Sequence, residues 1–149
     1  MDKKKKNIFV EGAIPPLLIA DSIAKHAVKN DIGAHSIFLG QIRADMVDGK
    51  TVRAIEYTTY DDLALNKISE IREAIFEKYP LTCMHIHHSL GTVNVGEICL
   101  FVFTSSGHRK AAMHACEEIV ERIKKELPIW GKEIFEDDTH QWKTNTQYG

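Results

Sequence analysis

Basic residues at the two ends of one predicted helix are the side chains with the clearest chemical use. His108 and Arg109 follow a Ser-Ser-Gly turn at the start of this helix, and Lys124 lies near its end. Cations at a helix N-terminus oppose the helix macrodipole, so a fold selected only for stability would avoid them there. Free backbone N–H groups and added cations together make a site for an anion. The stretch therefore predicts an anion site, with serine capping of a solvated helix end as the alternative.

Helical spacing distinguishes Lys124 from its neighbour Lys125. The apolar face of the helix consists of Ala112, Cys116, Ile119, Val120, Ile123 and Leu127. At about 100° per residue, Lys124 lies at the margin of this face and Lys125 lies toward solvent. Lys124 can therefore place its amine at the edge of a pocket, where apolar walls and other cations would lower its pKa and make it a usable nucleophile or base. The alternative is a solvated lysine that favours the negative end of the helix dipole.

Two further cations lie in segments that could meet this helix. Pro128 ends the helix, and Lys132 follows closely enough in sequence to share a site with Lys124. Arg43 closes the segment Gly40-Gln41-Ile42-Arg43, where a hydrophobic strand runs into a loop. An arginine at a strand end can enter a site, although a solvated surface position is the alternative for both residues.

Histidines on a third segment raise the question of a metal. His85 and His87 share one face of a predicted strand with Cys83, whereas His88 points to the other face. A His-x-His pair can bind zinc, but no second compact pair of ligands accompanies it. We therefore expect no metal site and keep a metal-binding protein as an alternative. Cys99 lies in an apolar strand and is interpreted as an inert core thiol.

The composition is that of one ordinary globular domain spanning residues 1–149, with residues 1–6 expected to be disordered. The chain is 44% hydrophobic and 27% charged, and its net charge of −2 gives no general attraction to nucleic acid or to membrane lipid. No apolar run is long enough to span a bilayer, and no apolar segment follows Lys3–Lys6 as in a signal peptide. Three widely spaced cysteines favour a reducing, cytoplasmic location.

The elements that must position these residues alternate only in part between strands and helices. Helices are expected at 15–28, from Asp61 or Asp62 to Tyr79, and in the long segment before Pro128. A polar loop with an Asp48-Gly49 turn is expected at 44–50. Strands are expected at 7–11, 34–43, 52–59, 82–90, 97–105, 129–135 and 141–144. Adjacent strand pairs favour an α+β fold with a mixed, mainly antiparallel sheet and packed helices.

Four motifs, taken together, carry a family resemblance from about Gly33 to Trp142. They are Gly40-Gln41-Ile42-Arg43, Gly91 to Gly96-Glu97, Gly107-His108-Arg109, and Lys124-x-x-x-Pro128-x-Trp130 with Lys132-Glu133. In this order and spacing the chain resembles the family of large, catalytic subunits of molybdopterin synthase. The resemblance implies an α+β fold with an α/β-hammerhead portion.

The resemblance also implies a reaction and its partners. The reaction is the successive insertion of two sulfurs into cyclic pyranopterin monophosphate to give the molybdopterin dithiolene. Sulfur comes from the C-terminal thiocarboxylate of a small ubiquitin-like subunit, whose tail enters the large subunit. Large subunits pair as a homodimer within a heterotetramer. No cofactor, metal, nucleic acid or membrane is implied.

Residue by residue, the resemblance implies a catalytic role for Lys124 and a second catalytic role for Lys132. It implies substrate-binding positions at Gln41, Ile42, Arg43, His108, Arg109, Gly131 and Glu133. Gly131 stands where the family commonly has a second lysine, and Lys132 comes one residue later. Adjacent side chains of an extended segment face opposite ways, so the substitution is not a simple one. A groove that binds a peptide tail without catalysis is the alternative function.

Overall fold

The computed structural model describes residues 7–143, so the disorder expected for residues 1–6 lies outside the described part of the chain. Helices are α1 (Pro16–His26), α2 (Asp61–Lys78) and α3 (Arg109–Glu126). Strands are β1 (Phe9–Glu11), β2 (Ala34–Gln41), β3 (Met46–Val47), β4 (Lys50–Thr59), β5 (Leu81–Asn94), β6 (Ile98–Ser106), β7 (Ile129–Phe135) and β8 (His140–Trp142). None of the helices within residues 7–143 is long and apolar enough to cross a membrane.

The strands form one sheet in the order β2-β6-β5-β4-β7-β8, with β1 paired to β5 and β3 paired to β4. The β1–β5 pair is parallel, and the other strand pairs of the described chain are antiparallel. The predicted α+β fold with a mixed, mainly antiparallel sheet is thus confirmed. The hammerhead portion and the single-domain organisation stay predictions.

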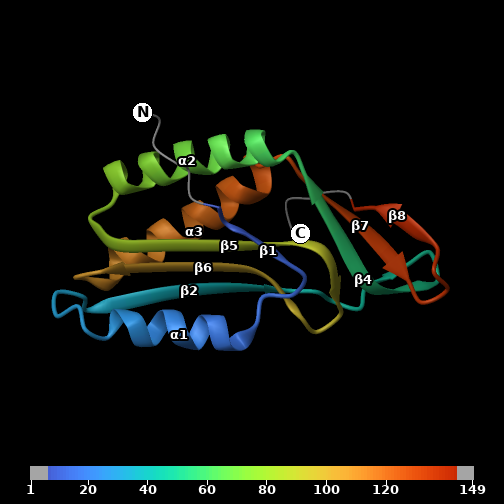
Figure 1. Ribbon diagram of the computed structural model, residues 1–149, viewed down its shortest axis with the longest axis horizontal. Helices are drawn as coiled ribbons and strands as arrows, with labels where there is room; N and C mark the ends of the chain where they lie inside the picture. The colour runs from blue at the N-terminus through green and yellow to red at the C-terminus, as the bar shows by residue number, and fades with distance from the viewer. Residues whose placement is uncertain (1–6, 144–149) are drawn as a thin grey trace.

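Helices cover both faces of the central strands (Figure 1). Helix α1 lies on one face, and α2 and α3 lie on the other. Because side chains alternate along a strand, β6 sends Phe101 and Phe103 toward Ile14 and α1, and Leu100 and Val102 into the core beneath α2 and α3. The two faces of β5 and β6 therefore belong to separate environments.

Strand β5 belongs to both ends of the sheet. Its first part pairs with β6 up to His88, and its last part, from Gly91 to Asn94, pairs with β4. The prediction that this strand ends at Leu90 is wrong. Gly91 has a φ of 79°, which allows the chain to change direction while the strand continues into a second pairing.

Several boundaries also differ from the sequence-based expectation. Strand β2 ends at Gln41 and not at Arg43. The predicted loop 44–50 contains β3, which pairs with the start of β4 around the Asp48-Gly49 turn. Helix α3 begins at Arg109, with His108 as its N-cap residue. The last strand ends at Trp142, and residue 144 of the expected strand 141–144 lies outside the described range.

Candidate active site

Two cavities share a wall near the C-terminal end of α3. One has a volume of about 100 Å³ and the other about 380 Å³. The residues common to both linings are Gly40, Tyr57, Cys99, Lys124 and Lys143. We call the two joined cavities the lysine pocket. Residues of β2, β4, β6 and the segment after β8 line these cavities together with the last turns of α3. No local sequence signal could have shown that these segments meet.

Lys124 lies where the two cavities meet. It remains accessible to solvent, but the protein around its ammonium removes hydration and lowers its pKa. The positive charges of Lys143 and Arg43 lower this pKa further. Lys125 lines neither cavity. The prediction from helical spacing, with Lys124 at a pocket edge and Lys125 in solvent, is confirmed.

Lys143 is the pocket residue that the sequence reasoning missed. Its backbone N–H donates to the carbonyl of Gly131 over 2.8 Å, and the neighbouring Lys132–Trp142 pair fixes the register. Residues directly opposite in an antiparallel pair project from the same face, so Lys143 emerges on the face where Gly131 has no side chain. A Cβ at Gly131 would approach Ile55 Cγ2 to 3.1 Å and Tyr57 Cε1 to 3.3 Å. The pocket wall is thus closely packed at Gly131. The second ammonium of the pocket belongs to Lys143, which directly follows β8.

Lys132 does not belong to the lysine pocket. It lines neither cavity, and its Nζ lies 3.7 Å from a carboxylate oxygen of Glu56. Its neighbours Gly131 and Glu133 do line the pocket, as the alternation of an extended segment requires. Glu133 is 7% exposed and accepts a hydrogen bond from Gln141.

The inner wall carries two polar rings held in their neutral forms. Burial lowers the pKa of His88 to about 4, and the charge of Lys124 acts in the same direction. His88 Nδ1 donates to the Ser89 carbonyl over 2.7 Å. Burial, and then negative charge on Cys99 and Glu133, raises the pKa of Tyr57 well above its ordinary range. At neutral pH these two rings therefore add no charge to the pocket.

The segment after β2 forms the rim of the larger cavity. Ile42 and Arg43 line it together with Gln41, the last residue of β2, and their substrate-binding role stays a prediction. Ile42 is buried, whereas Arg43 is exposed and its Nε lies 3.3 Å from a carboxylate oxygen of Asp45. Asp45 lines the same cavity, so a negative charge neutralises part of the arginine at the mouth of the pocket.

Cys99 is also part of this wall. Its side chain is 9% exposed, as the apolar strand predicted, but it lines both cavities beside Lys124. The interpretation of Cys99 as a buried core thiol is confirmed, and its inertness stays a prediction. The sequence pattern correctly gave its burial and could not show which surface it faces.

His108 and Arg109 lie at the opposite end of α3 from the lysine pocket. Both are exposed, and Arg109 makes no ion pair within the described residues 7–143. At 1.5 Å per residue, the 15 steps from Arg109 to Lys124 separate their Cα atoms by about 22 Å. Within one chain, His108 and Arg109 therefore do not lie near Lys124.

A group of residues with metal-ligand chemistry lies on the other face of the sheet. His26, Cys83 and His85 place one potential ligand atom each within 4.8 Å of the others. His85 and Cys83 share a face, as predicted, but the third member is His26 and not His87. His26 comes from α1, so no spacing rule on the strand could have found it.

Comparisons with known proteins agree with this architecture. The profile of the MoaE protein family matches residues 16–126. The molybdopterin synthase catalytic subunit of Bacillus subtilis is 38% identical over 122 residues, covering 82% of this chain and 76% of that protein. The chain spans 33% and 65% of the length of two other curated relatives that it matches.

Solved structures show the same fold. The crystal structure of molybdopterin synthase from Staphylococcus aureus superposes with a TM-score of 0.79 at 32% identity, covering 92% of this chain and 96% of that one. A complex of subunits 1 and 2 of molybdopterin-converting factor from Helicobacter pylori contains a chain that matches with a TM-score of 0.78 at 19% identity, covering 92% of this chain and 89% of that one. From the family profile and these relatives, the chain belongs to the MoaE protein family.

Proposed function

We propose that this chain is the catalytic subunit of a molybdopterin synthase, and that the lysine pocket inserts two sulfurs in succession into cyclic pyranopterin monophosphate. The observation that carries the proposal is the position of Lys124, with its lowered pKa, where two joined cavities meet. Family membership supplies the reaction, and the pocket supplies groups that suit it.

The substrates are anions, and the pocket is locally cationic in a chain of net charge −2. A cyclic phosphate and a thiocarboxylate tail both need fixed donors, which Lys124, Lys143 and Arg43 can provide. In each insertion a carbon–sulfur bond forms at the substrate and a carbon–oxygen bond breaks, and water then cleaves the acyl carbon–sulfur bond of the tail to leave a carboxylate. The departing oxygen needs a proton. A lysine with a lowered pKa releases its proton more readily as the ammonium, and more of it is present as the free amine that can accept a proton. Lys124 is accordingly the proposed proton donor and acceptor.

Lys143 takes the position that the family resemblance gave to Lys132. It shares both cavities with Lys124, whereas Lys132 faces Glu56. We therefore assign Lys143, and not Lys132, as the second cation of the proposed site. Gln41, Ile42, Gly131 and Glu133 remain proposed substrate-binding positions because each lines one of the two cavities.

The proposed sulfur donor is a small ubiquitin-like subunit with a C-terminal thiocarboxylate. The complex of two subunits from Helicobacter pylori, which has a chain of the same fold, supports a two-protein assembly. Two joined cavities suit a reaction in which a peptide tail and a small substrate meet at one lysine.

His108 and Arg109 enter the proposal only through a second copy of the chain. Their separation of about 22 Å from Lys124 along one rigid helix prevents a site within one chain. In a symmetric dimer the start of one α3 can approach the end of the other, because the same patch is used by both copies. A homodimer within a heterotetramer is therefore the proposed assembly.

Dithiolene formation tests the proposed function directly. Purified chain, cyclic pyranopterin monophosphate and a thiocarboxylated small subunit are combined, and product from the native chain is compared with Lys124→Ala and Lys125→Ala. We expect product from the native chain and Lys125→Ala, and little or none from Lys124→Ala, because only Lys124 reaches the pocket.

The same samples separate catalysis from binding. If the native chain binds the small subunit and makes no product, the chain is a binding module for a peptide tail. If Lys124→Ala turns over as fast as Lys125→Ala, the lysine pocket is not the active site.

A further inference from the structure

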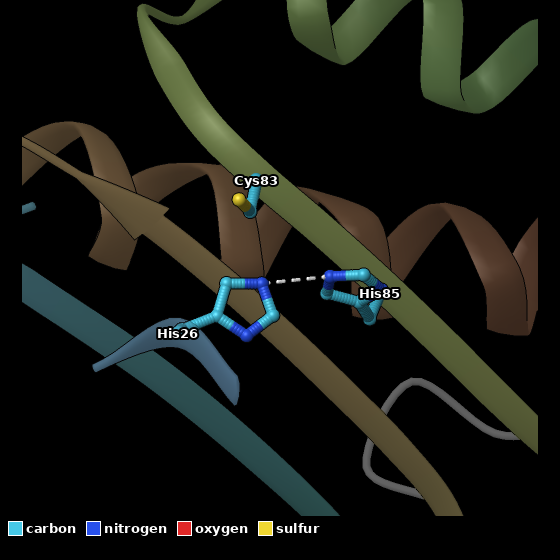
Figure 2. A group of neighbouring side chains, drawn as sticks. All are labelled: His26, Cys83 and His85. Atoms are coloured by element: carbon cyan, nitrogen blue, oxygen red, sulfur yellow. Dashed lines mark hydrogen bonds between the residues drawn. The ribbon is translucent and has the colours of Figure 1, made fainter. Parts of the chain in front are cut away.

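A second candidate site lies on the α1 face of the sheet, away from the lysine pocket. Figure 2 shows His26 from the end of α1 facing Cys83 and His85 from β5. His26 Nε2 and His85 Nε2 are joined by a hydrogen bond over 3.0 Å, and one ligand atom from each of His26, Cys83 and His85 lies within 4.8 Å of the other two. Two ring nitrogens and a thiol from two elements therefore converge on one small space.

The protonation of His26 suits a ligand. Its Nδ1 lies 2.6 Å from the Ser22 carbonyl oxygen, which can only accept a hydrogen bond, so Nδ1 carries the hydrogen. A neutral His26 then presents a lone pair from Nε2 toward His85. A backbone carbonyl holding the distal ring nitrogen is the arrangement that orients histidine ligands in metal sites.

The space between the three side chains matches a zinc ion. Zinc binds imidazole nitrogen at about 2.0–2.1 Å and thiolate sulfur at about 2.3 Å, so tetrahedral ligand atoms lie about 3.3–3.6 Å apart. The Nε2–Nε2 distance of 3.0 Å is slightly shorter than this separation. The upper limit of 4.8 Å on the distances among the three ligand atoms is longer than it. Side-chain movements of about an ångström at the rings and the sulfur would close the coordination. Mixed nitrogen and sulfur donors favour zinc over magnesium, calcium or manganese.

Burial and access are also suitable. His26 is 8% exposed and Cys83 is 6% exposed. A cavity of about 500 Å³ next to them is lined by both histidines of the group and also by His87 and Asp21. A fourth ligand, either water or a carboxylate, can reach the site from this cavity.

Two contacts oppose metal binding. With its hydrogen on Nδ1, His26 accepts the hydrogen bond from His85 through Nε2, so His85 must move this hydrogen to its Nδ1 before its Nε2 can bind a metal. Lys29 Nζ lies 2.9 Å from Cys83 Sγ, and this ammonium must move from the sulfur as a metal approaches. Lys29 is exposed and follows the last turn of α1, so its side chain has solvent into which it can turn.

We propose that His26, Cys83 and His85 form a zinc site that joins the end of α1 to β5, with the fourth position open to the adjacent cavity. On binding, the Cys83 thiol loses its proton to solvent, one sulfur–zinc bond and two nitrogen–zinc bonds form, and the metal keeps its oxidation state. The site is separate from the proposed sulfur-transfer reaction, because His26, Cys83 and His85 face α1 whereas the lysine pocket lies at the end of α3.

Cobalt(II) is the probe for the ligand set, because it takes zinc sites and gives a thiolate charge-transfer band only when sulfur is bound. The full chain, stripped of metal, is titrated with cobalt(II) and then with zinc against a chromophoric chelator. We expect the charge-transfer band in the native chain and its loss in Cys83→Ser. Zinc affinity should fall in His26→Ala and His85→Ala by more than the roughly 10- to 100-fold loss typical when only a second-shell partner is removed.

His87→Ala is the matched control, since His87 is on the same face of the same strand but outside the three-residue group. We expect it to retain the cobalt band and the zinc affinity. Equal loss in His87→Ala and His85→Ala would overturn the assigned ligand set. Absence of the charge-transfer band in the native chain would overturn the site as a whole.

Thermal unfolding gives a second readout that does not depend on the histidine variants folding well. Metal that binds only the folded chain raises its unfolding temperature. Added zinc should raise this temperature in the native chain and not in Cys83→Ser. An equal rise in both proteins would mean that zinc binds elsewhere, which would also overturn the proposal. Neither readout uses dithiolene formation, so failure here is distinguishable from failure of the proposed function.

Discussion

Lys124 and Lys143 place two positive charges on one wall of the lysine pocket, and each affects the proton of the other. Lys143 is the largest charged influence on Lys124 after burial, and it lowers the pKa of Lys124 from an ordinary 10.5. A neighbouring charge of the same sign disfavours the protonated form. In the proposed reaction, the second lysine of the pocket therefore acts through the first, in addition to any contact with substrate.

This relation predicts a shift in the pH profile. If the neutral amine of Lys124 accepts a proton, kcat/KM rises with pH through the lowered pKa of Lys124. Lys143→Met removes a positive charge, raises that pKa and moves the rising limb to higher pH. Lys132→Met is the control and should leave the limb in place, because Lys132 faces Glu56. A limb that moves equally in both variants would contradict the assignment of Lys143.

The ion pair at the pocket mouth makes a second prediction. Asp45 neutralises part of Arg43 where an anionic substrate would enter. Asp45→Asn should lower KM for cyclic pyranopterin monophosphate by up to about fivefold, since an exposed ion pair is worth roughly 0.2–1 kcal/mol. Asp48→Asn, a change of the same charge in the nearby turn, is the control for a general effect of net charge. An unchanged KM in Asp45→Asn would place the substrate away from Arg43.

At the scale of elements, the loop after α1 packs directly against the turn before α3. Gly33 donates its N–H to the Ser106 carbonyl over 3.0 Å. A Cβ at Gly33 would lie 2.2 Å from the Gly107 carbonyl oxygen, whereas a Cβ at Gly107 would meet only the Asp31 carbonyl oxygen at 3.6 Å. A side chain at residue 33 would therefore clash with the backbone of Gly107, whereas a side chain at residue 107 would make an ordinary contact.

The asymmetry gives a matched pair of alanine substitutions. Gly33→Ala forces two backbone segments apart and should lower the free energy of unfolding by about 1–3 kcal/mol. Gly107→Ala makes an ordinary contact and should change it by no more than about 0.5 kcal/mol. Urea unfolding of the two variants measures both values. Equal losses would show that the two segments do not meet as closely as the structure places them.

The sequence predicted the elements that have a strong local period and missed what distant segments bring together. Helical spacing distinguished Lys124 from Lys125, and strand alternation separated the face of His85 from that of His88. No local pattern connects Lys143 with Lys124, because their proximity depends on the β7–β8 pairing and on the packing of α3. His26 and Cys83 are likewise 57 positions apart and meet only when α1 covers the sheet.

At the scale of the whole molecule, the two ends of α3 supply different proposed parts of one site. A complementation experiment tests this arrangement. Lys124→Ala and Arg109→Ala chains are unfolded together, refolded as a mixture and assayed for dithiolene formation at a substrate concentration far below the KM of Arg109→Ala. If each site uses Arg109 from one copy and Lys124 from the other, hybrid dimers contain one intact site, and the mixture regains about a quarter of native activity.

Each variant refolded alone is the control for the mixture. Activity in the mixture that equals the average of the two separate variants would contradict a shared site. Arg109→Ala alone should mainly raise KM, because an exposed arginine that binds an anionic substrate contributes to affinity more than to the chemical step.

Strand β5 has a consequence for how this fold tolerates insertions and deletions. Cys83 and His85 point toward α1, whereas His88 points into the lysine pocket. Losing or gaining one residue near the start of the strand would turn every following side chain to the other face. The histidine of one site would then enter the other, and both would fail together although they share no residue. We therefore expect length changes in β5 to be tolerated in steps of two, as measured by soluble expression and by zinc binding across a series of one- and two-residue deletions.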